Sequence, residues 1–151
     1  MRRVDQLFLE YEAFHKDPRN KLCHYLGITL IVFTIVSLLE QVRLLETPAG
    51  PLDLALPVVV GVVGFYLFLD VALGVGALFL LAAALVGGRY VPWPVSVGVF
   101  LFGWVLQFVG HAFEGKRPAF LRNGVHLLVG PLWILSHLYE KVGLRAKSAP
   151  A

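Results

Sequence analysis

Five histidines are the residues of this 151-residue chain best suited to chemistry: His15, His24, His111, His126 and His137. Neutral imidazole is the commonest metal ligand in proteins, and imidazole with or without a carboxylate suits iron, zinc or copper. Glu114 follows His111 by three residues and would share its helical face. It is therefore the nearest candidate carboxylate ligand, or equally a partner that orients a histidine.

The composition indicates that these histidines belong to an integral membrane protein. Hydrophobic residues make up 58% of the chain and charged residues only 15%, and the mean hydropathy is +0.74. A soluble domain of this size needs a larger polar share to cover its surface. The net charge is only +3, and no run resembles a nucleic-acid-binding patch. We expect one integral membrane domain over residues 1–151, with the bilayer as its partner and no nucleic acid.

Hydrophobic periodicity predicts an all-α polytopic membrane bundle of about four to five membrane segments, preceded by an N-terminal amphipathic interfacial helix. Residues 1–21 would form that helix, over 3–16, and a loop after Pro18. The bundle would occupy residues 22–139, with apolar runs at 22–39, 54–69, 71–88, 90–113 and 124–139. Residues 40–53 would be a polar loop and 140–151 a flexible basic tail. Whether 54–88 is two spans or a re-entrant hairpin, and whether 124–139 crosses, stays open.

Basic residues predict which ends of these segments meet. They precede the first span and follow the fourth at Lys16, Arg19, Lys21, Lys116, Arg117 and Arg122. The positive-inside rule places both groups, and with them the N-terminus, in the cytoplasm. The start of the first span and the end of the fourth would then lie at one membrane face. Four histidines fall in that layer, whereas His137 lies about 16 Å beyond His126 along a helix.

Two interpretations of the histidine layer remain open at this point. A single histidine at a membrane interface is ordinarily an amphipathic anchor. Four histidines in one layer support a metal site about as strongly as they support anchoring. The nine-residue spacing between His15 and His24 matches no standard local metal motif. Lys116 and Arg117 are most simply topology charges, although a fatty carboxylate would also meet them there.

Two sequence stretches carry a family resemblance. The first is His15-Lys-Asp-Pro-Arg-Asn20-Lys21-Leu-Cys-His24-Tyr-Leu-Gly27-Ile, and the second is Gln107-Phe-Val-Gly110-His111-Ala-Phe113-Glu114-Gly-Lys-Arg-Pro118-Ala119, followed by Gly130-Pro131. Together they resemble the Mpo1-like family, formerly the domain of unknown function 962. Its pattern has a His, an Asn and a His before the first span and then a Gly-His-x-Phe-Glu-x-x-x-Pro-Ala block. The resemblance covers nearly the whole chain in order.

The resemblance implies an iron(II)-dependent dioxygenase of lipid α-oxidation, which uses dioxygen to shorten a 2-hydroxy fatty acid by one carbon. Carried over by motif, His15, His24 and His111 are the metal positions, and Asn20 and Glu114 stand beside them as catalytic candidates. His126 is added as a ligand from its place in the layer, and Lys116 and Arg117 as substrate-binding residues. Sparse Asn and Gln suggest a prokaryotic inner-membrane protein, and a eukaryotic member would reside in the endoplasmic reticulum.

Other functions stay open beside this one. The same donors would suit a zinc-dependent lipid hydrolase, in which the metal activates water and oxygen is not needed. In a non-enzymatic membrane protein, the histidines would only anchor the chain or sense pH. Four glycines in the middle segments would allow close helix approach, within the chain or in a homodimer: Gly61, Gly64, Gly74 and Gly76.

Overall fold

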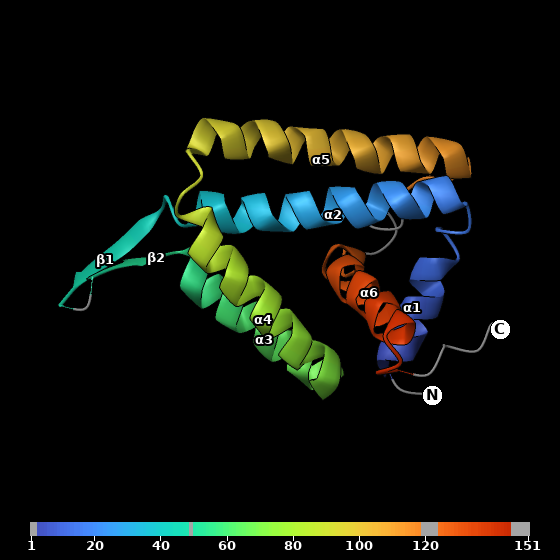
Figure 1. Ribbon diagram of the computed structural model, residues 1–151, viewed down its shortest axis with the longest axis horizontal. Coiled ribbons are helices and arrows are strands. Elements are labelled where there is room, and N and C mark those ends of the chain that lie inside the picture. Colours follow the sequence, from blue (N-terminus) through green and yellow to red (C-terminus); the bar gives the residue numbers. More distant parts are fainter. Residues whose placement is uncertain (1–2, 49, 119–123, 146–151) are drawn as a thin grey trace.

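The computed structural model describes residues 3–48, 50–118 and 124–145, which form a helical bundle with a small β-hairpin at one end (Figure 1). In chain order, the elements are α1 (Arg3–Glu12), α2 (Pro18–Leu39), β1 (Arg43–Thr47), β2 (Gly50–Asp53), α3 (Ala55–Leu69), α4 (Val71–Gly88), α5 (Trp93–Glu114) and α6 (His126–Lys141). Within the described residues, three helices are long and apolar enough to span a bilayer, namely α2, α4 and α5. The predicted all-α membrane bundle is confirmed in this form.

Two segments differ from the sequence prediction. Pro18 was expected to end the first helix, but it begins α2: Asp17 is the N-cap, and its carboxylate accepts the Arg19 amide at 2.8 Å. Proline suits the first helical position because the amide it lacks would have no partner there. The expected loop over residues 40–53 instead contains the antiparallel pair β1 and β2, which projects from the bundle (Figure 1).

Helices α2 and α5 run antiparallel along the length of the bundle and pack closely (Figure 1). Glycines make this approach possible. A Cβ atom on Gly27 would overlap the Gln107 amide and lie 2.8 Å from the Gly103 carbonyl oxygen. A Cβ atom on Gly110 would lie 2.5 Å from Asn20 Oδ1. The pairing brings the start of α2 to the end of α5, as the topology argument predicts.

The remaining helices form two pairs on the opposite side of α2 from α5 (Figure 1). Helices α3 and α4 form a hairpin at Asp70, whose carboxylate accepts the Leu73 amide at 3.1 Å and caps α4. At 15 residues, α3 is about 22 Å long and falls short of the roughly 30 Å hydrocarbon core of a bilayer. Helix α1 packs its apolar face on α6 through Val4, Phe8 and Tyr11.

Two hydrophobic clusters hold these pairs against α2. Cluster A joins α1 and α6 to the start of α2 and to parts of α3 and α4, with buried members Val4, Phe8, Tyr11, Ile28, Tyr66, Leu73, Ala77, Val129, Leu132, Trp133 and Leu135. Cluster B joins the end of α2 to α3 and α4, with buried members Val36, Ala55, Val59, Val63, Leu81 and Ala84. The core is therefore divided, and each end of α2 has its own packed neighbours.

Candidate metal centre

Three histidines from three different segments meet where α1, α2 and α5 converge. His15 follows α1, His24 lies in the second turn of α2, and His111 lies in the last turn of α5. Each offers a ring nitrogen, and these nitrogens lie within 4.8 Å of one another. The ring centroids of His24 and His111 are 4.7 Å apart, and those of His15 and His24 are 4.3 Å apart. All three side chains are buried, so the rings could hold a metal ion between them.

Backbone hydrogen bonds fix how two of these rings present their nitrogens. His15 Nδ1 lies 2.7 Å from the Tyr11 carbonyl oxygen, and His24 Nδ1 lies 3.0 Å from the Asn20 carbonyl oxygen. Because a carbonyl oxygen only accepts, both Nδ1 atoms must carry the proton and donate it. This leaves each Nε2 with a lone pair, which is the tautomer that a metal requires.

Unmet hydrogen bonding identifies the same place. His15 Nε2 and His111 Nδ1 are buried and have no hydrogen-bond partner among the described residues. Buried polar atoms are nearly always paired, because leaving one unpaired costs about 1–3 kcal/mol. Burial also lowers the pKa of His15 to about 4, which keeps this imidazole neutral at physiological pH. The donor set of three neutral, converging imidazoles fits a divalent transition metal.

Two aromatic residues of cluster A, Tyr11 and Trp133, pack against His15. The Tyr11 ring stacks on the His15 ring with 4.1 Å between centroids and 10° between planes. Trp133 lies 5.4 Å from His15 and donates its indole N–H to Glu12 at 3.2 Å. Lys21 also donates to Glu12, at 2.6 Å. These contacts restrict the rotation of the His15 ring and close the side of the site toward α6.

Glu114 and Asn20 hold the turn that carries His15. The Glu114 carboxylate accepts the backbone amides of Lys16 at 3.0 Å and Asp17 at 2.8 Å. It also accepts the Asn20 side-chain amide at 3.0 Å, and the same amide nitrogen donates to the Phe14 carbonyl at 3.0 Å. These hydrogen bonds favour an orienting role for Glu114 over direct binding of a metal, because its carboxylate oxygens already accept from the turn between α1 and α2 and from Asn20.

The other predicted site residues lie around this group and do not join it. His126 Nε2 lies 3.5 Å from a Glu10 carboxylate oxygen, and its ring is 6.0 Å from that of Tyr11. Lys116 donates to the Ala13 carbonyl at 2.8 Å, and Arg117 is exposed. Their roles as ligand and substrate-binding residues stay predictions. His137 packs on Trp133 with 4.5 Å between centroids, outside the group as expected.

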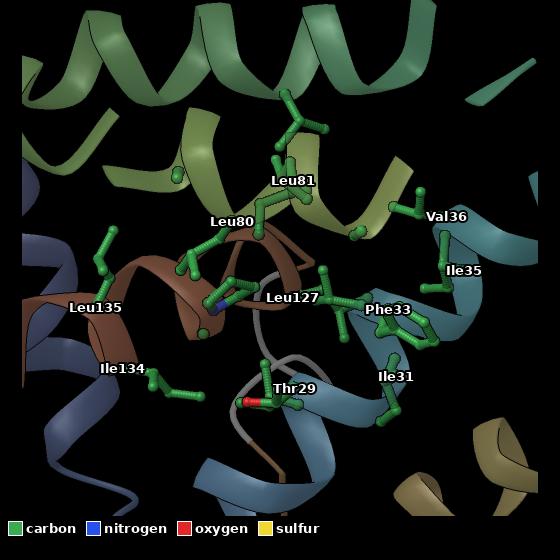
Figure 2. Close-up of a pocket in the computed structure, with 18 of the residues that line it drawn as sticks. Thr29, Ile31, Phe33, Ile35, Val36, Leu80, Leu81, Leu127, Ile134 and Leu135 are labelled. Carbon is green, nitrogen blue, oxygen red and sulfur yellow. The ribbon is translucent and has the colours of Figure 1, made fainter. Parts of the chain in front are cut away.

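A cavity of about 600 Å³ extends from the histidines between α2, α4 and α6, and residues of α3 and α5 also line it. Figure 2 shows part of its lining, where apolar side chains of α2, α4 and α6 surround a common space: Ile31, Phe33, Ile35, Val36, Leu80, Leu81, Leu127, Ile134 and Leu135. His15, His24, His111 and His126 line it at one end. The volume falls within the range of about 300–1,000 Å³ that is usual for small-molecule sites.

Sequence reasoning missed two contributors to the site. Tyr11 was not singled out as a site residue, although a residue four positions before His15 lies one helical turn away and can stack on it. Gly110 was quoted as part of the family motif without a role. In the structure it provides space for Asn20 and His24, whose Nδ1 would lie 3.1 Å from an added Cβ atom.

The fold and the site define a membrane protein in which three buried imidazoles stand at one end of an apolar cavity. Comparison with known proteins agrees. Residues 1–142 match the family model described as "2-hydroxy-palmitic acid dioxygenase Mpo1-like", and the chain belongs to this Mpo1-like family. It is 33% identical over 137 residues to 2-hydroxy-palmitic acid dioxygenase MPO1 of Saccharomyces cerevisiae, an alignment that covers 88% of this chain and 78% of the yeast protein. No solved structure matches.

Proposed function

We propose that this protein is an iron(II)-dependent dioxygenase that shortens 2-hydroxy fatty acids by one carbon. The observation that carries the proposal is the convergence of three buried histidine nitrogens at one end of an apolar cavity. The relative named as a 2-hydroxy-palmitic acid dioxygenase supports the same chemistry and substrate class. His15, His24 and His111 would hold the metal, and His126 is a further candidate at the same cavity.

Iron(II), when bound, would supply the redox chemistry with dioxygen and sites for the substrate's hydroxyl and carboxylate. The chain's own residues would do the rest. The Tyr11 and Asn20 carbonyls hold His15 and His24 in the tautomer that presents Nε2. Glu114 and Asn20 fix the turn on which His15 stands, so these two are positioning residues. Buried aromatic neighbours restrict the access of water to the centre.

The membrane location suits a substrate with a polar head and a long tail. The head would lie among the histidines, and the tail would extend along the cavity, where burial of each CH₂ group stabilises binding by about 0.8 kcal/mol. From the basic residues beside the first and fourth predicted spans, we place the site and the N-terminus at the cytoplasmic face. Lys116 and Arg117 would attract the carboxylate to that face before it enters.

The test is metal analysis of detergent-purified protein beside its His111→Ala variant, after reconstitution of both with iron(II). We expect near-stoichiometric iron in the wild type, at least a tenfold loss of metal affinity in His111→Ala, and oxygen uptake with 2-hydroxy fatty acids by the wild type alone. His137→Ala is the matched control, because it removes a histidine outside the group, and it should keep its metal.

The outcomes separate the competing functions. Oxygen-independent release of fatty acid from a lipid ester by a zinc-loaded protein would favour the hydrolase, since three histidines with an open position also suit catalytic zinc. If neither protein retains metal after reconstitution, the dioxygenase proposal is wrong and the histidines have an anchoring role. Metal binding that His111→Ala leaves unchanged would also contradict the proposed ligand set.

A further inference from the structure

The cavity has a closed end as well as a histidine end. Helices α2 and α4 converge at Gly88, where an added Cβ atom would lie 3.1 Å from the Ser37 Cα atom. One turn earlier on α4, Ala84 lines the cavity and is buried beside Val36 and Leu81 in cluster B. Val36 is twelve residues beyond His24 on α2, or about 18 Å along the helix. Leu39, one turn further along α2, also lines the cavity. The cavity is therefore long, with polar groups at one end and aliphatic side chains at the other, next to the close approach of α2 and α4.

The walls between these two ends are mostly apolar. Four side chains that carry a polar atom line the cavity away from the histidine group: Thr29, Tyr66, Trp104 and Gln107. Thr29 donates to the Tyr25 carbonyl at 2.7 Å, Tyr66 donates to the Leu128 carbonyl at 2.7 Å, and Gln107 lies 3.5 Å from the Cys23 carbonyl oxygen. The remaining wall is aliphatic and aromatic, so only an apolar ligand gains from entering it.

The void also separates two packed clusters. Members of cluster A (Ile28, Ala77) and of cluster B (Val36, Ala84) both line it, and exposed side chains such as Leu80 and Leu127 show that it also opens to the outside of the bundle. An occupant with a polar head and one unbranched apolar tail matches its length, its walls and its two ends.

We propose that this cavity is an acyl-chain channel closed by Val36, Leu81 and Ala84, and that Ala84 sets the longest chain the protein accepts. The inference rests on the proposed function for the identity of the head group and adds a residue that determines chain-length specificity. Ala84 is suited to this role because it is small, buried and at the closed end. A larger side chain there would fill the place of the terminal carbons and leave the histidine end unchanged.

The test uses full-length protein in lipid nanodiscs without metal, so that binding is measured apart from turnover. The probe is a fatty acid with a diazirine at its terminal carbon, and the competitors are 2-hydroxy fatty acids of increasing length. In the wild type, the label should react with α2 and α4 near the closed end. In Ala84→Phe, each methylene group excluded should weaken competition about fourfold, so that the longest acids lose at least about tenfold while short ones are unaffected.

Ala82→Phe is the matched control, because Ala82 lies on the same helix but is exposed on its outer face. It should keep the wild-type length profile, and Ala84→Leu should give an intermediate one. If Ala84→Phe does not fold, Ala84→Leu and the position of the label in the wild type decide. An unchanged profile in the Ala84 variants, or a label that reacts only with the lipid-facing side of α5, overturns the inference. Labelling that no 2-hydroxy acid displaces would assign the cavity to a bilayer lipid and overturn it too.

Failure of this inference is distinguishable from failure of the proposed function. If the length profile shifts in Ala84→Phe but the iron-loaded wild type consumes no oxygen, the channel stands and the dioxygenase does not. If the iron-loaded wild type turns over 2-hydroxy acids and the Ala84 variants keep its length profile, the dioxygenase stands and Ala84 does not set chain length.

Discussion

The two ends of the α2–α5 pair both bury polar side chains, but they use them differently. At one end, His24 and His111 face His15, and nitrogens of two of these rings are buried without a hydrogen-bond partner among the described residues. At the other end, Ser37 donates to the Gly88 carbonyl at 2.9 Å and pairs with Ser96 at 2.8 Å. The serines connect α2, α4 and α5 within the protein itself.

We interpret this difference as one between polar groups that hold the fold and polar groups that could hold a metal ion. A buried hydroxyl pair contributes modestly when both partners are present and becomes costly when one is removed. Buried nitrogen lone pairs that converge without a donor lower the stability of the free protein. Such a destabilising arrangement is typical of functional sites, where it serves ligand binding. We therefore expect substitutions at the serine end to change stability alone and substitutions at the histidine end to change metal affinity.

The largest effect should come from Gly110→Ala. The added Cβ atom would lie 2.5 Å from Asn20 Oδ1 and 3.0 Å from the Cys23 Cβ atom, so α2 must move away from α5 beside the histidines. We expect metal affinity to fall at least about 100-fold and stability by about 1–3 kcal/mol, as is usual for overpacking. Chelator competition and thermal unfolding in detergent measure the two quantities.

Gly98→Ala is the control for Gly110→Ala, since Gly98 lies on the same helix and a Cβ atom there meets open space. It should leave metal affinity unchanged and stabilise the helix by up to about 1 kcal/mol. Equal metal affinity in Gly110→Ala and the wild type would mean that the histidine arrangement does not depend on close helix approach.

Close contacts between distant segments, such as that of Gly110 with Asn20, could not be predicted from the sequence. Hydrophobic runs and basic flanks predicted the bundle and which helix ends meet, because the hydrocarbon thickness and the positive-inside rule constrain both. They could not choose between ligation and orientation for Glu114, since what favours orientation is a set of hydrogen bonds from Lys16, Asp17 and Asn20 that only the folded chain brings together. They also missed the hairpin of β1 and β2, because neither the exposed strand β1 nor the mostly half-buried strand β2 has a hydrophobic alternation that would identify it.

Glu114→Gln should have the next largest effect. The amide keeps one acceptor but turns an N–H₂ group toward the amide donors of Lys16, Asp17 and Asn20, which loosens the turn that carries His15. Loss of such an orienting partner typically lowers metal affinity about 10–100-fold. The measurement is a metal titration against a chelator. Glu46→Gln, an exposed carboxylate paired with Arg43 on β1, should have no effect, and an equal loss in both variants would contradict the orienting role.

Ser37→Ala tests the other end of the comparison. It leaves the Ser96 hydroxyl and the Gly88 carbonyl without their partner in a buried place, which should cost about 1–3 kcal/mol. Metal affinity should not change, because Ser37 is thirteen residues, or about 20 Å along α2, from His24. Thermal unfolding of Ser37→Ala, Ser96→Ala and the double variant measures the coupling between the two hydroxyls. Additive losses would mean that the pair contributes nothing as a pair.

Glu40→Gln should give the smallest effect, and its sign depends on pH. Glu40 follows α2 at the serine end, where Oε1 accepts from Arg89 at 3.3 Å and Oε2 is buried without a hydrogen-bond partner among the described residues. Burial raises the pKa of Glu40 above its ordinary value of 4.5, although Arg89 opposes the shift. The folded state then binds this proton more tightly than the unfolded state, so the stabilisation is complete below about pH 4.5 and is lost as the pH rises through the folded pKa.

Glutamine resembles the protonated acid, so Glu40→Gln should unfold at a higher temperature than the wild type at neutral pH and at the same temperature near pH 4. The gain should stay below about 1 kcal/mol, because the variant also loses the ion pair with Arg89; that loss should not cancel the gain, since the Arg89 side chain is 65% exposed and the pair is screened by solvent. A variant less stable than the wild type at neutral pH would mean that the Arg89 pair outweighs the burial of the charge. In that case the serine end would hold its helices by charge pairing as well as by hydroxyl bonds, and would differ from the histidine end more than the hydrogen bonds alone indicate.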